Sequence, residues 1–313
     1  MNKVAWLFPG QGSQAVGMGQ ALAASGHQAT EKALGAADSA LGYSLSKIMA
    51  EGPEETLKLT EHTQPAILTH SIMALEFCRA RLPKPNFVAG HSLGEYTALV
   101  AAGSIDFEAA VVAVKARGRF MQEAVPFGTG DMVAVIGMAA ADVEAACAAA
   151  AESTGKVVVP ANYNGAGQIV IAGHLEAVEA AVEILKSKGG RKMMKLPVSA
   201  PFHSPLMKPA QRAMEPIIKS LEIKPPICPL VNNVDAVPVT DPEVIRQGLI
   251  RQIPSPVRWE DTMKFLLSQG VTTYIGLGGK VLTTIAIKMA KEAGIEIKAL
   301  SIGAPDDLEQ LQN

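Results

Sequence analysis

The fold is decided by the segment Phe87-Val88-Ala89-Gly90-His91-Ser92-Leu93-Gly94-Glu95-Tyr96-Thr97-Ala98-Leu99-Val100. It begins with an apolar run typical of a buried strand and ends with residues that favour a helix. The residues between them fit the pattern G-x-S-x-G, in which a sharp turn from strand to helix lifts the serine hydroxyl clear of the sheet. The flanking glycines remove side chains that would collide with the neighbouring backbone. The segment therefore predicts an α/β sheet with Ser92 at the carboxyl end of one strand.

Strands and helices alternate on both sides of this segment. Apolar residues predict a strand over residues 4–8, a helix that opens at Gln64-Pro65 and ends near Leu82-Pro83, and a helix over residues 107–125. Three further strands are expected over residues 227–231, 273–277 and 297–302. Such alternation is typical of a mostly parallel sheet covered by helices.

The order of elements changes in the middle of the chain. Strands are expected over residues 132–138, 157–162, 168–172 and 192–198, and helices over 141–152 and 175–188. The resulting order, β-α-β-β-α-β, is that of a ferredoxin-like unit. We therefore expect a large α/β domain made of residues 1–126 and 200–313, with a small ferredoxin-like domain of residues 127–199 inserted into it.

Composition excludes several classes of protein. The 313 residues are 48% hydrophobic and 19% charged, which is ordinary for a folded chain. Lys and Arg total 28 against 30 Asp and Glu, and aromatic residues make up 4%, so neither a positive field nor a stacking surface for nucleic acid is expected. Charges or turn residues interrupt every apolar stretch before it reaches the roughly 20 residues that cross a membrane. We expect a soluble protein that binds neither nucleic acid nor membrane.

The chain start and the cysteines indicate a cytoplasmic protein. The first apolar run reaches Pro9-Gly10 too soon to serve as the core of a signal peptide. Cys78, Cys147 and Cys228 are odd in number, far apart and not arranged as CxxC pairs. This pattern predicts buried free thiols rather than a disulfide framework or a zinc site.

Ser92 is a candidate nucleophile, and it needs a base. Among the histidines, His203 is distinctive because the prolines of Pro197-Val198-Ser199-Ala200-Pro201-Phe202-His203-Ser204-Pro205 restrict the backbone on both sides of it. His91 is the second candidate base. The alternatives are that Ser92 caps a helix with Glu95 as its capping-box partner and that His203 is an ordinary histidine of a surface loop.

An acyl intermediate on a serine also needs donors for its oxyanion. The turn offers the Leu93 N–H, and Gln11 follows the first predicted strand, so both would face one crevice at the carboxyl ends of parallel strands. The competing interpretation of Gly10-Gln11-Gly12 is a phosphate-binding turn, but Ala15 stands where G-x-G-x-x-G requires glycine.

Arg117 lies three residues after Val114, at the border of the apolar stripe of its predicted helix. An arginine held there is suited to grip a carboxylate through two hydrogen bonds. The alternative is a solvated helix face shared with Lys115 and Arg119, and the residues by themselves favour that alternative.

Several motifs in this order resemble the malonyl-CoA:acyl carrier protein transacylases of fatty-acid synthesis. They are Phe8-Pro9-Gly10-Gln11-Gly12-Ser13-Gln14, Thr63-Gln64-Pro65-Ala66, Gly90-His91-Ser92-Leu93-Gly94-Glu95-Tyr96, Arg117-Gly118-Arg119-Phe120-Met121-Gln122, Asn162-Tyr163-Asn164, Ala200-Pro201-Phe202-His203-Ser204 and Arg251-Gln252. The resemblance covers nearly the whole chain. It implies an α/β-hydrolase-like large domain with an inserted ferredoxin-like small domain.

The resemblance also implies a role for individual residues. Ser92 is then the nucleophile, His203 its base, and Gln11 and the Leu93 amide the oxyanion contacts. Arg117 binds the free carboxylate of the malonyl group, which overturns the solvated-face interpretation, and the main-chain carbonyl of Gln252 orients the histidine. The remaining substrate-binding residues are Gln64, His91, Asn162 and Phe202, of which Phe202 would crowd a substrate with a methyl branch.

Malonyl-CoA and acyl carrier protein are the implied partners, and we expect no cofactor, no metal and a monomer. The family often has Gly-Pro-Gly-Lys where this chain has Leu277-Gly278-Gly279-Lys280. A serine hydrolase, a non-catalytic acyl-binding module and an acyltransferase of polyketide synthesis are the alternatives. Because carrier proteins are acidic, a basic contact surface is expected, and its candidate residues are Lys186, Lys188, Arg191, Lys192 and Lys195. The alternative is that these residues form a solvated helix end.

Overall fold

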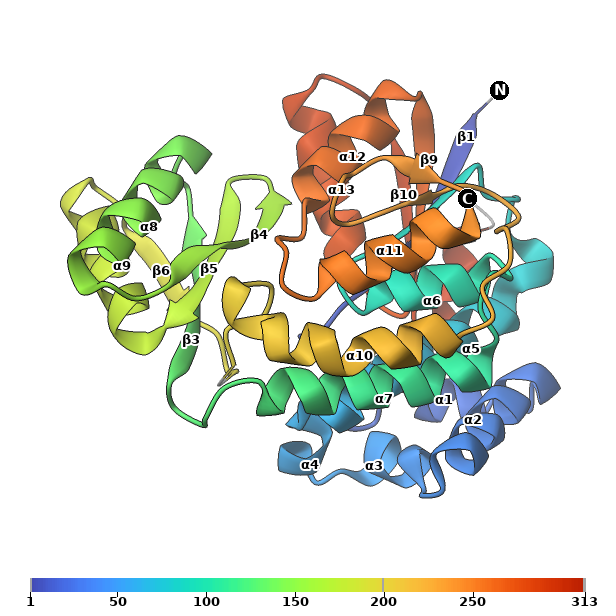
Figure 1. Cartoon of the computed structure of the whole chain (residues 1–313). Helices are drawn as coiled ribbons and strands as arrows, with labels where there is room; N and C mark the ends of the chain where they lie inside the picture. The colour runs from blue at the N-terminus through green and yellow to red at the C-terminus, as the bar shows by residue number, and fades with distance from the viewer. Residues whose placement is uncertain (1, 199, 312–313) are drawn as a thin grey trace.

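The computed structural model describes residues 2–198 and 200–311, which form a larger body and a smaller lobe beside it (Figure 1). The larger body is built on a six-stranded sheet, with β1, β2, β7, β9 and β10 paired in parallel and β8 antiparallel to β7. Its strand order is β10 (Lys298–Ile302), β9 (Val271–Leu277), β1 (Lys3–Phe8), β2 (Phe87–Gly90), β7 (Leu230–Val231) and β8 (Pro238–Val239).

The two faces of this sheet are both buried under helices, as a mostly parallel sheet requires. Along β1, Trp6 and Phe8 join one apolar cluster, whereas Ala5 and Leu7 join the other. The helices of this body are α1 (Gln20–Ala23), α2 (Gln28–Leu41), α3 (Leu45–Glu51), α4 (Glu54–Lys58), α5 (Thr60–Cys78), α6 (Gly94–Ala101), α7 (Phe107–Glu123), α10 (Lys208–Ser220), α11 (Pro242–Gln252), α12 (Trp259–Ser268) and α13 (Val281–Glu292), with short 3-10 turns η1 (Arg79–Arg81), η2 (Pro205–Met207) and η3 (Pro305–Leu311). The apolar alternation of β1 thus fixes it at the centre of three layers.

The smaller lobe contains the predicted order of elements. It comprises β3 (Gly130–Ile136), α8 (Ala140–Thr154), β4 (Val158–Gly165), β5 (Gln168–His174), α9 (Leu175–Ser187) and β6 (Lys192–Lys195). The strands form an antiparallel sheet in the order β4-β5-β3-β6. Residues of both helices and the sheet, among them Val135, Cys147 and Leu185, share one apolar core.

The two sheets are joined by main-chain hydrogen bonds. Val257, in the segment before α12, donates its N–H to the Ala161 carbonyl at 2.9 Å and accepts from the Tyr163 N–H at 2.9 Å. These bonds form an isolated parallel bridge between Val257 and Asn162 of β4. The smaller lobe is therefore joined to the larger body by main-chain hydrogen bonds at this point.

Several predicted boundaries were wrong. Helix α5 begins at Thr60 and ends at Cys78, so Pro65 lies inside the helix and not in its first turn. The strand expected over residues 192–198 ends at Lys195, because Pro197 has no N–H to continue an edge ladder. The strand expected over 227–231 is reduced to Leu230–Val231, since Pro229 interrupts it.

Two further expectations from composition concern the cysteines and the length of apolar helices. The free, buried state predicted for Cys78, Cys147 and Cys228 is confirmed. Within the described residues, no helix is long and apolar enough to cross a membrane.

Gly118 allows helix α7 to pack closely on the start of α5. A Cβ atom placed at this glycine would collide with the main-chain carbonyl of Thr60. Because backbone cannot move aside as a flexible side chain can, the two helices would have to separate. The spacing of these helices matters because the adjacent Arg117 points between them.

We predict that Gly118→Ala lowers the free energy of unfolding by about 2 kcal/mol, the cost typical of overpacking. Urea unfolding measures this change. Gly35→Ala is the matched control, since Gly35 lies within α2 and a Cβ there meets nothing within 4 Å. That variant should gain about 0.5 kcal/mol from the lower helix cost of alanine. Equal effects of the two substitutions would contradict the packing argument.

Candidate active site

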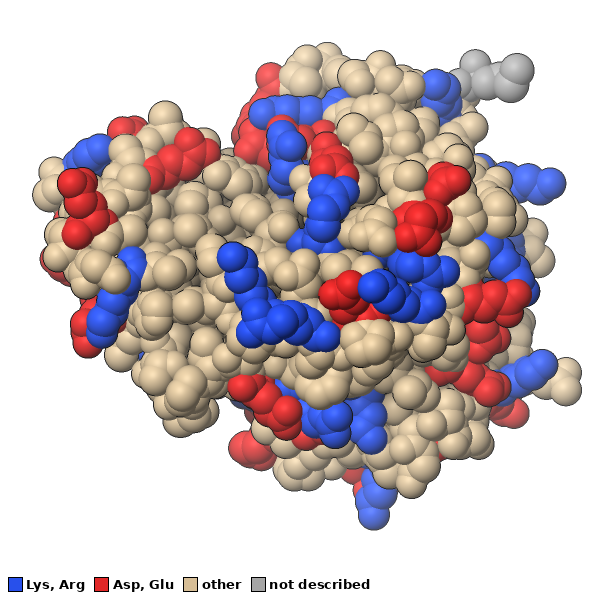
Figure 2. Space-filling view, viewed as in Figure 1, with Lys and Arg blue, Asp and Glu red and all other residues tan. Residues whose placement is uncertain are grey.

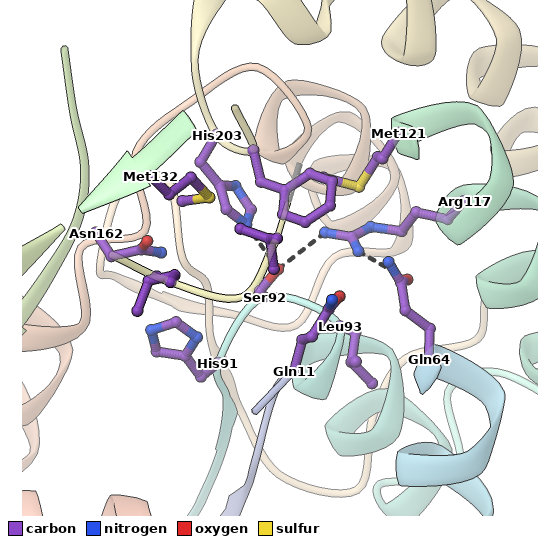
Figure 3. Close-up of a pocket in the computed structure, with 13 residues that line it drawn as sticks. Gln11, Gln64, His91, Ser92, Leu93, Arg117, Met121, Met132, Asn162 and His203 are labelled. Atoms are coloured by element: carbon purple, nitrogen blue, oxygen red, sulfur yellow. Dashed lines mark hydrogen bonds between the residues drawn. The ribbon is translucent and has the colours of Figure 1, made fainter. Parts of the chain in front are cut away.

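Ser92 lies in the tight turn between β2 and α6, with a backbone φ of 54° in the left-handed region. The turn is possible because a Cβ at Gly90 would collide with the Gly94 carbonyl, and a Cβ at Gly94 with the Phe8 carbonyl of β1. The Ser92 N–H donates to Asn233 Oδ1 at 2.7 Å. The predicted G-x-S-x-G turn is thus present, with the serine hydroxyl in a cavity (Figure 3).

His203 contacts the serine directly. Its Nε2 lies 2.7 Å from Ser92 Oγ. Its Nδ1 lies 3.2 Å from the main-chain oxygen of Gln252 and 3.1 Å from that of Ser255. Because carbonyl oxygens only accept, Nδ1 carries the proton, and Nε2 is left to accept the hydroxyl hydrogen of Ser92. Two carbonyls therefore orient the imidazole where a carboxylate does so in a Ser-His-Asp triad.

Burial sets the protonation state of His203, whose side chain is 3% exposed. Desolvation, and next the charge of Arg117, lower the pKa of His203 to about 3. A neutral imidazole at neutral pH is the form that can remove a proton. The alternative interpretation of His203 as an ordinary histidine of a surface loop is wrong, because the residue is buried.

Arg117 is buried, with 1% of its surface exposed. Its guanidinium donates to Gln64 Oε1 at 2.8 Å, to Ser92 Oγ at 3.0 Å and to Gln252 Oε1 at 2.8 Å. The solvated-face interpretation favoured by the residues alone is wrong for Arg117. The spacing of charged residues along α7 could not reveal this, because α5 covers the side of α7 from which Arg117 projects.

Gln11 and Leu93 reach the same cavity from neighbouring loops. His91 N–H donates to the Phe8 carbonyl at 3.0 Å, which holds the loop after β1 beside the serine turn. Leu93 precedes the first residue of α6, where main-chain N–H groups have no carbonyl partner within the helix. Gln11 Nε2 donates to Thr60 Oγ1 at 3.5 Å. Both predicted oxyanion donors therefore lie at the carboxyl edge of the sheet with Ser92.

The cavity has a volume of about 100 Å³ and also includes Gln64, His91, Asn162 and Phe202, so all four predicted substrate-binding residues line it. His91 does not contact the serine hydroxyl. Its Nε2 lies 2.8 Å from Asn164 Oδ1, and burial lowers its pKa. Four apolar lining residues were not predicted from the sequence: Met121, Met132, Leu196 and Val198.

Sequence reasoning also missed polar residues around the turn. Asn233 follows β7 at the same edge of the sheet, and Ser255 lies in the loop after α11. Glu95 is 1% exposed and accepts from Gln252 Nε2 at 2.8 Å, so it does not cap α6 as the alternative interpretation expected. The order Val231-Asn232-Asn233, polar residues directly after an apolar strand, was the one signal that pointed to Asn233.

The loop that departs from the family pattern lies next to the loop that follows β1, outside the lining of the cavity. Gly278 has a φ of 93°, and its N–H donates to the Ile302 carbonyl at 2.7 Å. A Cβ at Gly278 would collide with Ser71 Oγ, so glycine is required here for space as well as for conformation. Within the described residues, no three His, Cys, Asp or Glu side chains gather as a metal-ligand set.

Comparisons with known proteins show which family and which solved structures this chain resembles. Residues 5–300 match the model of the family described as acyl transferase domain. The chain is 47% identical to the Escherichia coli (strain K12) protein named malonyl CoA-acyl carrier protein transacylase, over 90% of this chain and 91% of that one. It is 43% identical to the Vibrio cholerae acyl carrier protein S-malonyltransferase, whose crystal structure matches with a TM-score of 0.93 over 98% of this chain and 99% of that one. A malonyl-transacylase in complex with its type II PKS acyl-carrier protein matches with a TM-score of 0.94 at 39% identity, over 99% of both chains.

We predict that His203 makes the stability of the protein depend on pH. In the unfolded chain a histidine takes up a proton below about pH 6.5, whereas the folded state keeps His203 neutral because its pKa is near 3. The unfolded state therefore binds more protons in this window, and stability falls as the pH falls. At pH 5 the cost is about 2 kcal/mol. Urea unfolding at pH 7.5 and pH 5 should show that His203→Gln loses less stability than the wild type by this amount. Parallel losses would mean that the imidazole is not held neutral.

Proposed function

The chain belongs to the malonyl CoA-acyl carrier protein transacylase family, and we propose that it transfers a malonyl group from malonyl-CoA to the phosphopantetheine thiol of acyl carrier protein through an ester on Ser92. One observation carries the proposal. The Ser92 hydroxyl lies 2.7 Å from a neutral imidazole and 3.0 Å from a buried guanidinium, in one small cavity. A base beside the hydroxyl makes it a nucleophile, and a buried cation beside the same hydroxyl suits an acyl group that carries a carboxylate.

In the first half-reaction His203 Nε2 takes the hydroxyl proton as Ser92 Oγ attacks the thioester carbonyl. We infer that the Leu93 N–H and Gln11 donate to the oxyanion that forms. The bond from carbon to sulfur then breaks, and the coenzyme A thiolate takes the proton from Nε2. In the second half-reaction the carrier thiol gives its proton to Nε2 and attacks the ester, which releases Ser92 with its hydroxyl restored.

These steps exchange one thioester for another through an ester, without oxidation or reduction, so the proposed reaction requires no cofactor. Arg117 supplies the selectivity. Its contact with Ser92 Oγ would be replaced by two hydrogen bonds to the malonyl carboxylate, a pairing that a neutral acyl group cannot make. Phe202 lines the cavity, and we propose that it crowds acyl groups with a methyl branch.

The domain organisation completes the proposal. We infer an α/β-hydrolase-like domain of residues 1–126 and 200–313 and a ferredoxin-like domain of residues 127–199. The sheet orders of the larger body and the smaller lobe support this division. Met1, Ser199 and residues 312–313, which these boundaries include, lie outside the described residues.

The acidic carrier protein requires a complementary contact. Three lysines of the predicted basic group are paired with acids: Lys186 with Glu183, Lys188 with Asp142, and Lys195 with Asp131. Arg191 and Lys192 form no ion pair with any described residue, so we propose them as the carrier contacts of this group. Basic and acidic side chains are interspersed over the face shown in Figure 2, which favours a local contact over a broad positive field.

We propose that the enzyme is a monomer that acts in the cytoplasm, without nucleic acid, and supplies malonyl units for fatty-acid synthesis. Buried free thiols and a net charge of -2 support this assignment. A carrier protein of polyketide synthesis is the second candidate acceptor, because one of the similar structures contains a type II PKS acyl-carrier protein.

We predict a stable malonyl ester on Ser92. Intact-mass spectrometry after mixing with malonyl-CoA should show one malonyl adduct on the wild type and none on Ser92→Ala, which lacks the attacking oxygen. Addition of a carrier protein with its phosphopantetheine arm should remove the adduct. Rapid release of malonate without any thiol would instead indicate a serine hydrolase, since a transferase must protect its acyl-enzyme from water.

We predict that Arg117→Ala lowers malonyl transfer at least 100-fold and lowers acetyl transfer much less, because the lost charge-assisted pairing serves only the carboxylate. The ratio of kcat/KM for malonyl-CoA and acetyl-CoA measures this difference. Arg119→Ala is the matched control from the exposed face of α7 and should leave the ratio unchanged. Similar losses with both donors would assign Arg117 a structural role only.

A further inference from the structure

The main chain of Ser92 is held at both ends by side chains from distant parts of the sequence. Its N–H donates to Asn233 Oδ1 at 2.7 Å, and its carbonyl accepts from Gln252 Nε2 at 2.9 Å. Asn233 Nδ2 also donates to the Gly90 carbonyl at 2.7 Å, so the clamp spans the start of the turn. Such support is needed because a serine with positive φ is strained and keeps that conformation only where its surroundings enforce it.

Asn233 and Gln252, the two residues that hold the Ser92 main chain, both donate a hydrogen bond to one oxygen of Glu95. Glu95 Oε2 accepts from Gln252 Nε2 at 2.8 Å and from the Asn233 main-chain N–H at 3.1 Å. The carboxyl group thereby fixes which way the Gln252 amide faces. With Nε2 turned to Glu95 and to the Ser92 carbonyl, the opposite atom, Oε1, is presented to the Arg117 guanidinium at 2.8 Å.

Burial of the Glu95 carboxyl group disfavours its charged form. Glu95 is 1% exposed, and desolvation raises its pKa to about 7 against the hydrogen bonds and the Arg117 charge that lower it. An apolar side chain of similar size would avoid that cost. A carboxyl oxygen at this position, however, serves as a double acceptor directly beneath the nucleophile turn.

We propose that Glu95 is a positioning residue of the acyl transfer, which acts through Gln252 and Asn233 to hold the nucleophile turn and to present Gln252 Oε1 to Arg117. This inference deepens the proposed function and rests on it. The Glu95 carboxyl group touches neither the Ser92 hydroxyl nor the cavity, and its hydrogen bonds go to those two neighbours, although its charge also acts on Arg117.

The effect of Glu95 should depend on its oxygen and on Gln252. Glu95→Gln keeps an acceptor of the same length, so it should retain the rate of Ser92 malonylation within about 3-fold. Glu95→Ala leaves the Gln252 amide free to turn and should lower that rate about 100-fold. In a Gln252→Ala background, the further change from Glu95→Ala should be below about 10-fold, because part of its route to the serine is already gone.

The test measures the rate at which malonyl-CoA malonylates Ser92, by rapid mixing with intact-mass spectrometry as the readout. It compares the wild type, both single Glu95 variants, Gln252→Ala and the double variant. A fluorophosphonate, which reacts with an activated serine regardless of acyl selectivity, is used in parallel. If the wild type reacts with the fluorophosphonate but not with malonyl-CoA, the proposed function fails, while the variants still test Glu95 through the fluorophosphonate.

Thr30→Val provides the matched control for loss of stability. Thr30 is fully buried in the larger body and donates to the Leu22 and His27 carbonyls, outside this network. It should lower the melting temperature without slowing malonylation. Equal rates for Glu95→Ala and the wild type would overturn the inference, as would a Glu95→Gln variant as slow as Glu95→Ala, or undiminished losses in the Gln252→Ala background.

Discussion

The left-handed backbone of Ser92 is the constraint on which the rest of the site depends. A serine adopts that conformation only where its surroundings leave no alternative. Here the surroundings are the glycines at 90 and 94, which let the turn approach β1, and the hydrogen bonds that hold both ends of the Ser92 main chain. The hydroxyl is consequently presented to His203 and Arg117 before any substrate arrives. Preorganisation of this kind transfers the cost of orientation from the reaction to folding.

Electrostatics in the cavity follow from burial more than from paired charges. His203 stays neutral because it is desolvated beside a cation, and main-chain carbonyls give it direction without adding negative charge. A carboxylate in their place would stabilise the imidazolium, and under the proposed function it would also compete with the malonyl carboxylate for Arg117. The nearest acid, Glu95, is separated from the guanidinium by the Gln252 amide. The arginine is therefore held in place and still has hydrogen-bonding capacity for an anion.

How much the sequence could predict depended on whether the signal was local. The strand, turn and helix around Ser92, and the order of elements in the smaller lobe, follow from residues within one window, and the structure contains them. Arg117 was misjudged from spacing alone, because one face of α7 is covered by another helix that periodicity cannot reveal. Asn233 lies 141 positions from Ser92 and 138 positions from Glu95, and Ser255 lies 52 positions from His203. No pattern within a short window of sequence encodes contacts between residues so far apart. Prolines caused the errors at α5, β6 and β7, since their effect depends on which neighbours compensate for the missing N–H.

The main-chain bridge between β4 and the segment before α12 has a mechanical consequence. The same stretch of chain, from Gln252 to Val257, supplies the carbonyls that orient His203 and the backbone bonds that join the two sheets. If the smaller lobe moved away from the larger body at this end, those bonds would break and the imidazole would lose its alignment. The cavity of Ser92, which residues of the larger body and the smaller lobe line together, should accordingly keep its width on the side of this bridge.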